Sequence, residues 1–169
     1  MLGTSIVAMP YGAPYHAPME SLLVRPENAG ALLYLAHGRP AAESGFGPPS
    51  GDVDRRHLGS HPDVVDRLWD ALNAALPADA RWLVFDSPAL VHPVSGVVVA
   101  AAIGTQYALR LLPDHVSEAR AAGAEVVHTF RTVGTTLDLP ATFGPDWVFG
   151  SWEERELAWL RASYEARSV

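Results

Sequence analysis

Residues 81–111 read RWLVFDSPALVHPVSGVVVAAAIGTQYALRL and decide the fold. Two apolar runs, residues 81–91 and 97–111, flank the turn-forming segment His92-Pro93-Val94-Ser95-Gly96. Runs of this length around a Pro/Gly-containing connection predict a pair of antiparallel strands. At about 3.3 Å per residue the second run would span about 50 Å, so we expect a bend or bulge near Gly104.

The second strand has one face of large side chains and one of small side chains. Alternate residues of a strand point to opposite faces of the sheet. We expect the large side chains to face the main core and the small ones to lie against a closely packed helix. The large set is Val97, Val99, Ile103, Tyr107 and Leu109, and the small set is Val98, Ala100, Ala102, Gly104 and Ala108.

Helical patterns surround this pair of strands. Residues 60–76 carry an apolar stripe, with Ser60 as the expected N-cap, Asp63 at the capping-box position and Pro77 after the end. A short helix is predicted over 114–122, ended by Gly123, and a third strand of the body over 125–137. The remaining expectations are a loop over 143–150 and a final helix capped by Ser151, with Glu154 at its capping-box position.

The chain before residue 60 divides into three parts. Residues 1–18 carry a proline at positions 10, 14 and 18, which predicts an extended arm. Residues 21–25 and 31–36 flank the turn-like Pro26-Glu27-Asn28-Ala29-Gly30 and predict a β-hairpin. Residues 38–59 form a long Gly/Pro-rich loop. The predicted fold is α+β in a single domain, 1–169: an N-terminal β-hairpin unit, the loop, and an α-β-β-α-β-α body (60–169) with a mainly antiparallel sheet covered by helices.

Composition limits the classes of function. The 169 residues are 49% hydrophobic and 18% charged, which is typical of a globular domain, and the net charge of −7 argues against nucleic acid as a partner. The absence of cysteine excludes disulfides and thiol chemistry, and the absence of lysine excludes a standard P-loop. The longest uninterrupted apolar run, 97–103, is far short of the roughly 20 residues of a membrane helix, so we expect a cytoplasmic protein without membrane contact.

One candidate site is the polar segment before the helix at 60–76. Asp52, Asp54, His57 and His61 are residue types that ligate divalent metals. Gly59 and the helix cap at Ser60 separate the two histidines, so their spacing differs from that of paired ligands on one helix. A solvated junction between loop and helix is the alternative interpretation.

Three other patterns are weaker. Asp86, Ser87 and His92 supply the residue types of a hydrolase triad, but no nucleophile elbow surrounds the serine. His128 lies in an apolar row, where a hydrogen-bonded core histidine is the simpler explanation. Arg110 and Arg131, on neighbouring predicted strands, would bind an anion or pair with acidic residues across the sheet.

The most suggestive candidate is the aromatic C-terminal quarter. Trp152 and Trp159 are seven residues apart and share one face of the final helix, with Glu156 between the apolar rows and Trp147 just before the helix. Tryptophan is enriched in binding hot spots, and an acidic residue framed by two indoles suits a partner's arginine. Tyr11 and Tyr15 of the N-terminal arm are further candidate contacts. A broad buried face is the alternative for this helix.

Two functions follow from these candidates. The preferred one is a small acidic non-enzymatic protein-binding module, of the immunity-protein, chaperone or adaptor type, which binds a protein partner or self-associates and uses no cofactor. The second is a metal-assisted hydrolase in which a divalent metal at Asp52, Asp54, His57 and His61 activates a water molecule.

Overall fold

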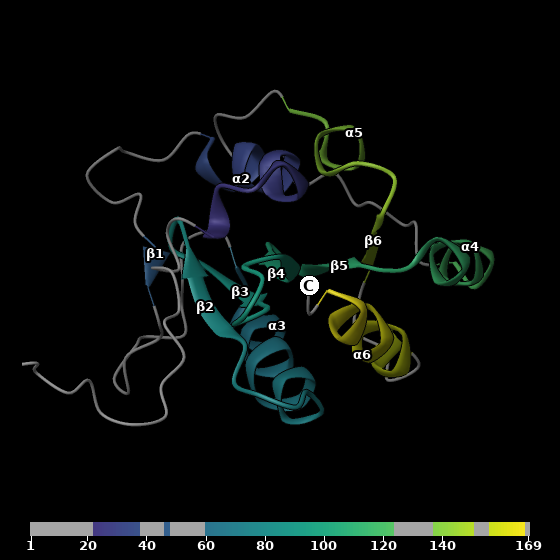
Figure 1. The fold of residues 1–169 in the computed structure, drawn as a ribbon. Coiled ribbons are helices and arrows are strands. Elements are labelled where there is room, and N and C mark those ends of the chain that lie inside the picture. Colours follow the sequence, from purple (N-terminus) through teal and green to yellow (C-terminus); the bar gives the residue numbers. More distant parts are fainter. Residues whose placement is uncertain (1–21, 38–45, 48–59, 124–136, 151–155, 168–169) are drawn as a thin grey trace, which may run out of the picture.

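The computed structural model describes residues 22–37, 46–47, 60–123, 137–150 and 156–167. At its centre is an antiparallel sheet in which each strand pairs with the next one along the chain (Figure 1). This arrangement confirms the predicted α+β class with an antiparallel sheet and covering helices. The strands are β1 (Phe46–Gly47), β2 (Arg81–Val84), β3 (Ser87–Val91), β4 (Val98–Ile103), β5 (Gln106–Arg110) and β6 (Trp147–Gly150).

Tight turns divide both of the long predicted strands. Phe85 and Asp86 adopt positive φ angles of 48° and 60° and reverse the chain between β2 and β3, as residues of two-residue hairpin turns do. Gly104, with φ 59°, begins the turn between β4 and β5. The predictions of single strands over 81–91 and 97–111 are therefore wrong. The argument from strand length predicted the interruption at Gly104 correctly. The turn between β2 and β3 was missed because it lacks the glycine that usually marks a turn.

The two faces of the sheet carry separate hydrophobic cores. Pairing across β3–β6 aligns one row on each face, and we call the two clusters the first and the second core. The first core contains the row Leu90, Ala100, Leu109 and Val148, and the second contains the row Ala89, Ala101, Ala108 and Phe149.

The predicted division of the second strand into large and small faces is only partly correct. Val97, Val99, Tyr107 and Leu109 share the first core as expected, but so do Ala100 and Ala102. The reason is that the pairing of β3 with β4 shifts between Leu90 and Val91, which leaves Val99 without a partner in β3.

Helices cover both faces and one edge of the sheet (Figure 1). The second core lies beneath α2 (Ala29–Ala36) and α5 (Leu139–Phe143), which also pack against each other. The first core lies beneath α3 (Pro62–Asp66), the π-helical segment η2 (Arg67–Leu72) and α6 (Glu156–Ala166). The helix α4 (Pro113–Ala121) packs against β6. Its end was predicted correctly, since Gly123 follows it with φ 90°.

The predicted N-terminal hairpin is wrong. Residues 26–36 form the 3-10 segment η1 (Pro26–Asn28) followed by α2. Pro26 occupies a first-turn position that proline tolerates, and Ala and Leu favour a helix. Ala31 and Leu35, one helical turn apart, are the buried residues of α2. The turn-forming residues that suggested a hairpin therefore begin a helix.

The remaining predictions concern the helix at 60–76, the loop at 143–150 and the C-terminal elements. The helix predicted over 60–76 is confirmed, but its N-cap is His61, whose side chain accepts a hydrogen bond from the Asp63 amide, and not Ser60. The loop predicted over 143–150 is wrong, because this segment contains the end of α5 and the strand β6. The predicted strand 125–137 and the predicted caps of the final helix lie outside the described residues, apart from Leu137. No helix in the described part of the chain is long and apolar enough to cross a membrane.

Candidate functional site

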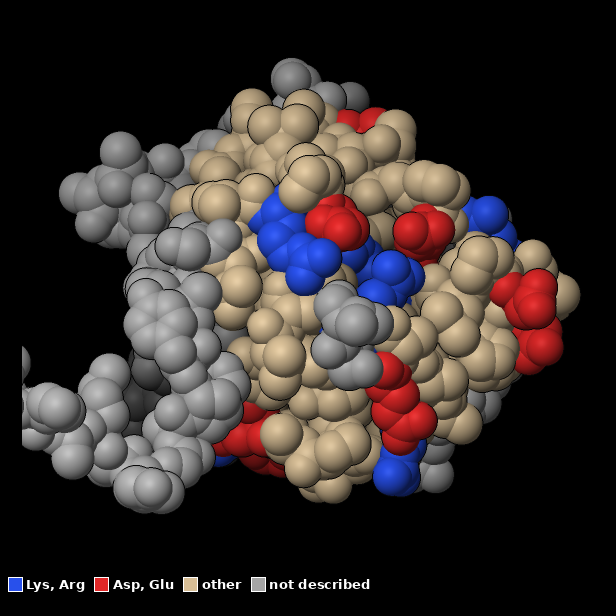
Figure 2. Space-filling model, viewed as in Figure 1, with Lys and Arg blue, Asp and Glu red and all other residues tan. Residues whose placement is uncertain are grey.

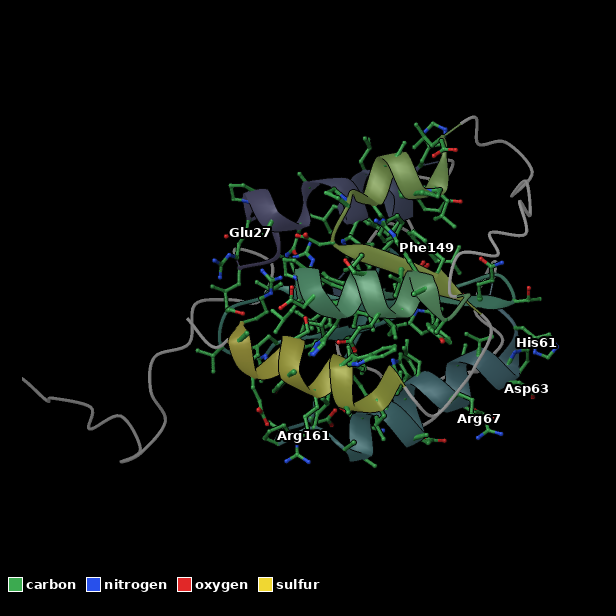
Figure 3. All side chains as sticks on the ribbon, turned by 90° about the vertical axis from the view of Figure 1, so that its right-hand side faces the viewer. Glu27, His61, Asp63, Arg67, Phe149 and Arg161 are labelled. Carbon is green, nitrogen blue, oxygen red and sulfur yellow. The ribbon has the colours of Figure 1, made fainter. Side chains whose placement is uncertain are left out.

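A pocket of about 240 Å³ opens between the helix α3–η2 and the turn from β4 to β5. We call it the helix pocket. Leu68, Leu72 and Tyr107, all buried, form its apolar floor. Asp63, Arg67 and Thr105 are exposed and form its polar rim, and Val64 completes the lining. Asp63 and Arg67 lie one turn apart along the helix, next to His61 (Figure 3).

Two hydrogen bonds hold the walls of the helix pocket together. The His61 amide donates a hydrogen bond to the Gly104 carbonyl oxygen at 2.7 Å, and the Ser60 hydroxyl donates to the Ala102 carbonyl oxygen at 3.1 Å. The start of the helix is thereby fixed on the β4–β5 turn. Beyond Asp66 the helix continues as η2, and π-helical turns of this kind are frequent at functional sites.

The volume of the helix pocket restricts what it can hold. Cavities for drug-sized ligands and cofactors measure about 300–1,000 Å³. At about 240 Å³ the pocket is smaller, which suits one large apolar side chain or a single small ring. An apolar floor with charged groups at the mouth is also the layout of the pockets that receive anchor side chains at protein interfaces.

Of the four predicted metal ligands, only His61 lies in the described part of the chain. His61 is exposed, and its Nδ1 accepts the Asp63 amide proton at 3.2 Å and lies 3.9 Å from Asp63 Oδ2. Asp52, Asp54 and His57 lie outside the described residues. Among the residues that are described, no three His, Asp or Glu side chains come together as a metal site would require. The metal site stays a prediction.

The structure describes only part of the predicted partner surface on the final helix. Trp159 is half-buried against the first core, and its ring stacks on His115 at 6.1 Å between centroids. Ala158, Arg161, Glu165 and Ala166 are the exposed positions of this stretch, and Arg161 Nε donates to Glu165 Oε1 at 3.2 Å. Arg161 projects away from the body of the protein (Figure 3). The outer face of α6 is thus small and charged where it is described.

Trp147 must be removed from the predicted partner surface. It lies on β6, is 2% exposed, and packs in the second core with its ring 4.8 Å from that of Phe143. The sequence suggested a loop at this position, and a tryptophan on a loop would be accessible. Tyr11, Tyr15, Trp152 and the side chain of Glu156 lie outside the described residues, so their predicted role stays a prediction.

The structure does not assemble a hydrolase triad from the candidates in 86–92. Ser87 begins β3 and His92 directly follows its last residue, so five steps along extended chain separate them by about 16 Å. Nδ1 of His92 accepts hydrogen bonds from the amides of Val94 and Ser95, and its ring packs on Tyr164 at 4.4 Å. His92 therefore stabilises the β3–β4 connection. His128 and Arg131 lie outside the described residues.

Sequence reasoning missed the helix pocket, because Leu68 and Leu72 fit a continuous buried stripe. They are indeed buried, yet the position of Thr105 beside them depends on the chain reversal at Gly104, which was expected only as a bend.

Comparison with known proteins adds no relative. No protein-family model matches the sequence, and searches of curated proteins and of solved structures also give no match.

Proposed function

We propose that this protein is a non-enzymatic protein-binding module whose helix pocket receives one apolar anchor side chain of a partner. The observation that supports this proposal is an open pocket with an apolar floor of Leu68, Leu72 and Tyr107. Burial of an aromatic or branched side chain there would remove apolar surface of both proteins from water.

The rim and the net charge favour a basic or neutral partner over a second copy of this chain. Asp63 and Arg67 lie at the mouth of the helix pocket. Charges at the rim of an interface determine the orientation and association rate of the partner more than its affinity. Two copies of a chain with net charge −7 repel each other over distances of about a Debye length. We therefore expect a hetero-complex.

The pocket is tested first with N-acetyl-tryptophanamide as a model of an anchor side chain. At about 0.3 kcal/mol for each of its roughly 18 non-hydrogen atoms, the dissociation constant should be about 0.1 to 1 mM. We expect a titration followed by ¹⁵N–¹H NMR to move the amide signals of Val64, Leu68 and Thr105. Thr105→Trp fills the mouth and should abolish the shifts, whereas Ala74→Trp, exposed on the same helix but outside the pocket, should leave them unchanged.

The partner itself is tested by native mass spectrometry of the protein purified gently from its host. We expect a stoichiometric second polypeptide with the wild type and with Ala74→Trp, and its loss with Thr105→Trp. A partner that remains bound to Thr105→Trp, or a probe that moves signals elsewhere only, would refute the role of the pocket.

A further inference from the structure

Arg110, at the end of β5, is a buried arginine, and the described residues use only part of its hydrogen-bond donors. It is 4% exposed, and its Nη2 donates to the Glu27 carbonyl oxygen. Its guanidinium carbon lies 5.0 Å from the centre of the Trp147 ring, a cation–π contact. Nε and Nη1 are both buried and have no hydrogen-bond partner among the residues that the structure describes. A buried donor without a partner destabilises the folded protein, and more strongly when it carries charge.

Arg167, directly after α6, adds a third unpartnered donor within electrostatic range of Arg110. Its Nε is buried and, within the described part of the chain, also has no hydrogen-bond partner. Burial, together with repulsion by Arg167, lowers the pKa of Arg110 to about 10, although the negative charges of Asp146 and Glu27 act to raise it. Arg110 therefore stays charged at neutral pH. Two neighbouring guanidinium groups with free buried donors are an arrangement that an anion would stabilise.

The local charges indicate which anion fits. Arg25 lies in the same neighbourhood, bound to the Glu27 carboxylate at 3.1 and 3.3 Å and to the Ser95 carbonyl oxygen at 2.7 Å. Among the described residues of this neighbourhood, three arginines less the two carboxylates of Glu27 and Asp146 leave a charge of +1. Basic and acidic side chains gather together at the middle of the face shown in Figure 2. A monoanion balances this charge, whereas a phosphate dianion would exceed it and face two carboxylates.

We propose that Arg110 and Arg167 form a binding site for a carboxylate group, which accepts hydrogen bonds from their unpartnered Nε and Nη1 donors. The sequence indicated an anion role for Arg110 with Arg131, which lies outside the described residues, and the structure brings Arg167 within electrostatic range of Arg110. The site is separate from the helix pocket: Glu27, whose backbone binds Arg110, and His61 lie at opposite sides of the molecule in Figure 3. The proposal therefore does not depend on the proposed function.

The test observes the arginine Nε–H signals directly by ¹⁵N–¹H NMR of the full chain during titration with sodium acetate. We expect the signals of Arg110 and Arg167 to move and saturate, while that of Arg161, which is paired with Glu165, stays in place. Arg167→Gln should weaken acetate binding about tenfold, the effect of losing one charge-assisted hydrogen bond of about 1.4 kcal/mol. Arg161→Gln is the matched control and should bind acetate like the wild type.

Further probes separate the sources of the carboxylate. Tighter binding of N-acetylglycine than of acetate would assign the site to a peptide C-terminus, and equal binding would assign it to a free carboxylate. N-acetylglycinamide, which lacks the charge, should not bind. The proposal is overturned by unmoved Arg110 and Arg167 signals, by equal shifts with sodium chloride, by unchanged binding in Arg167→Gln, or by phosphate binding more tightly than acetate.

Discussion

Asn28 is the residue that ties the N-terminal helical segment to the sheet. It is completely buried, and its Nδ2 donates to the carbonyl oxygens of Leu23 and Gly96 at 2.9 and 2.7 Å. Its Oδ1 accepts the Val98 amide proton at 2.9 Å. One side chain thus pairs three backbone groups, two of which lie about 70 residues further along the chain.

We expect Asn28→Ala to lower the free energy of unfolding by about 3–5 kcal/mol, because it leaves several buried backbone groups without partners. Urea denaturation followed by circular dichroism measures the change. Asn73→Ala is the matched control: its Oδ1 accepts one hydrogen bond, from the Ala80 amide, so a loss of about 1 kcal/mol is expected. Equal losses in the two variants would contradict the anchoring role of Asn28.

His92 makes stability depend on pH. Burial lowers its pKa below the ordinary value of 6.5. The unfolded chain therefore takes up a proton more readily than the folded protein, and stability is complete above about pH 6.5 and decreases as the pH falls below it. We expect the free energy of unfolding to fall between pH 7 and pH 5, and to fall less in His92→Asn, which keeps an acceptor but does not titrate. If His92→Asn keeps the wild-type slope, the assignment fails.

Among the elements, those with a strong period and a cap were predictable and those with ambiguous local chemistry were not. The stripe through Val65, Leu68 and Leu72 predicted the helix of the body, and these residues are buried as expected. The segment at 26–30 failed because proline, asparagine and glycine are shared by turns and helix starts. Only the contacts of Asn28 and of Gly30, which lies against the α5 backbone, decide between a turn and a helix start. The segments that make these contacts are far away in the sequence.

The same reason applies to the candidate sites. Both the helix pocket and the proposed carboxylate site of Arg110 and Arg167 join segments that are distant in sequence, across the β4–β5 turn and between β5 and the end of α6. Local patterns identify the residue types, but the partner of each residue depends on strand order and register.

Gly30 controls the packing of α2 on α5. A Cβ atom at this position would lie 2.2 Å from the Thr142 carbonyl oxygen and 3.0 Å from that of Phe143. Alanine favours a helix by about 1 kcal/mol over glycine, but the contact is with backbone and must displace a whole helix. We therefore expect Gly30→Ala to destabilise the protein by about 1–3 kcal/mol in urea denaturation. The second core should also loosen, seen as a moved Trp147 indole signal in NMR spectra. Gly123→Ala, where nothing lies within 4 Å, should leave that signal in place, and a stabilised Gly30→Ala would contradict the close packing.

At the scale of the whole molecule, the two cores share one set of strands. Neighbouring residues of β3, such as Ala89 and Leu90, enter different cores, so neither core can unfold without disrupting strands that the other requires. This arrangement supports the prediction that the chain unfolds as a single cooperative domain.

We expect the indole signals of Trp69, in the first core, and Trp147, in the second core, to disappear at the same urea concentration in NMR spectra. Leu160→Ala removes a buried side chain from the first core and Leu23→Ala one from the second, and each should cost about 2–5 kcal/mol. Because the shared strands couple the cores, each substitution should lower the midpoints of both tryptophan signals equally. If Leu23→Ala moved only the Trp147 transition, the α2–α5 layer would be a separate unfolding unit, and the shared sheet would not couple the two faces.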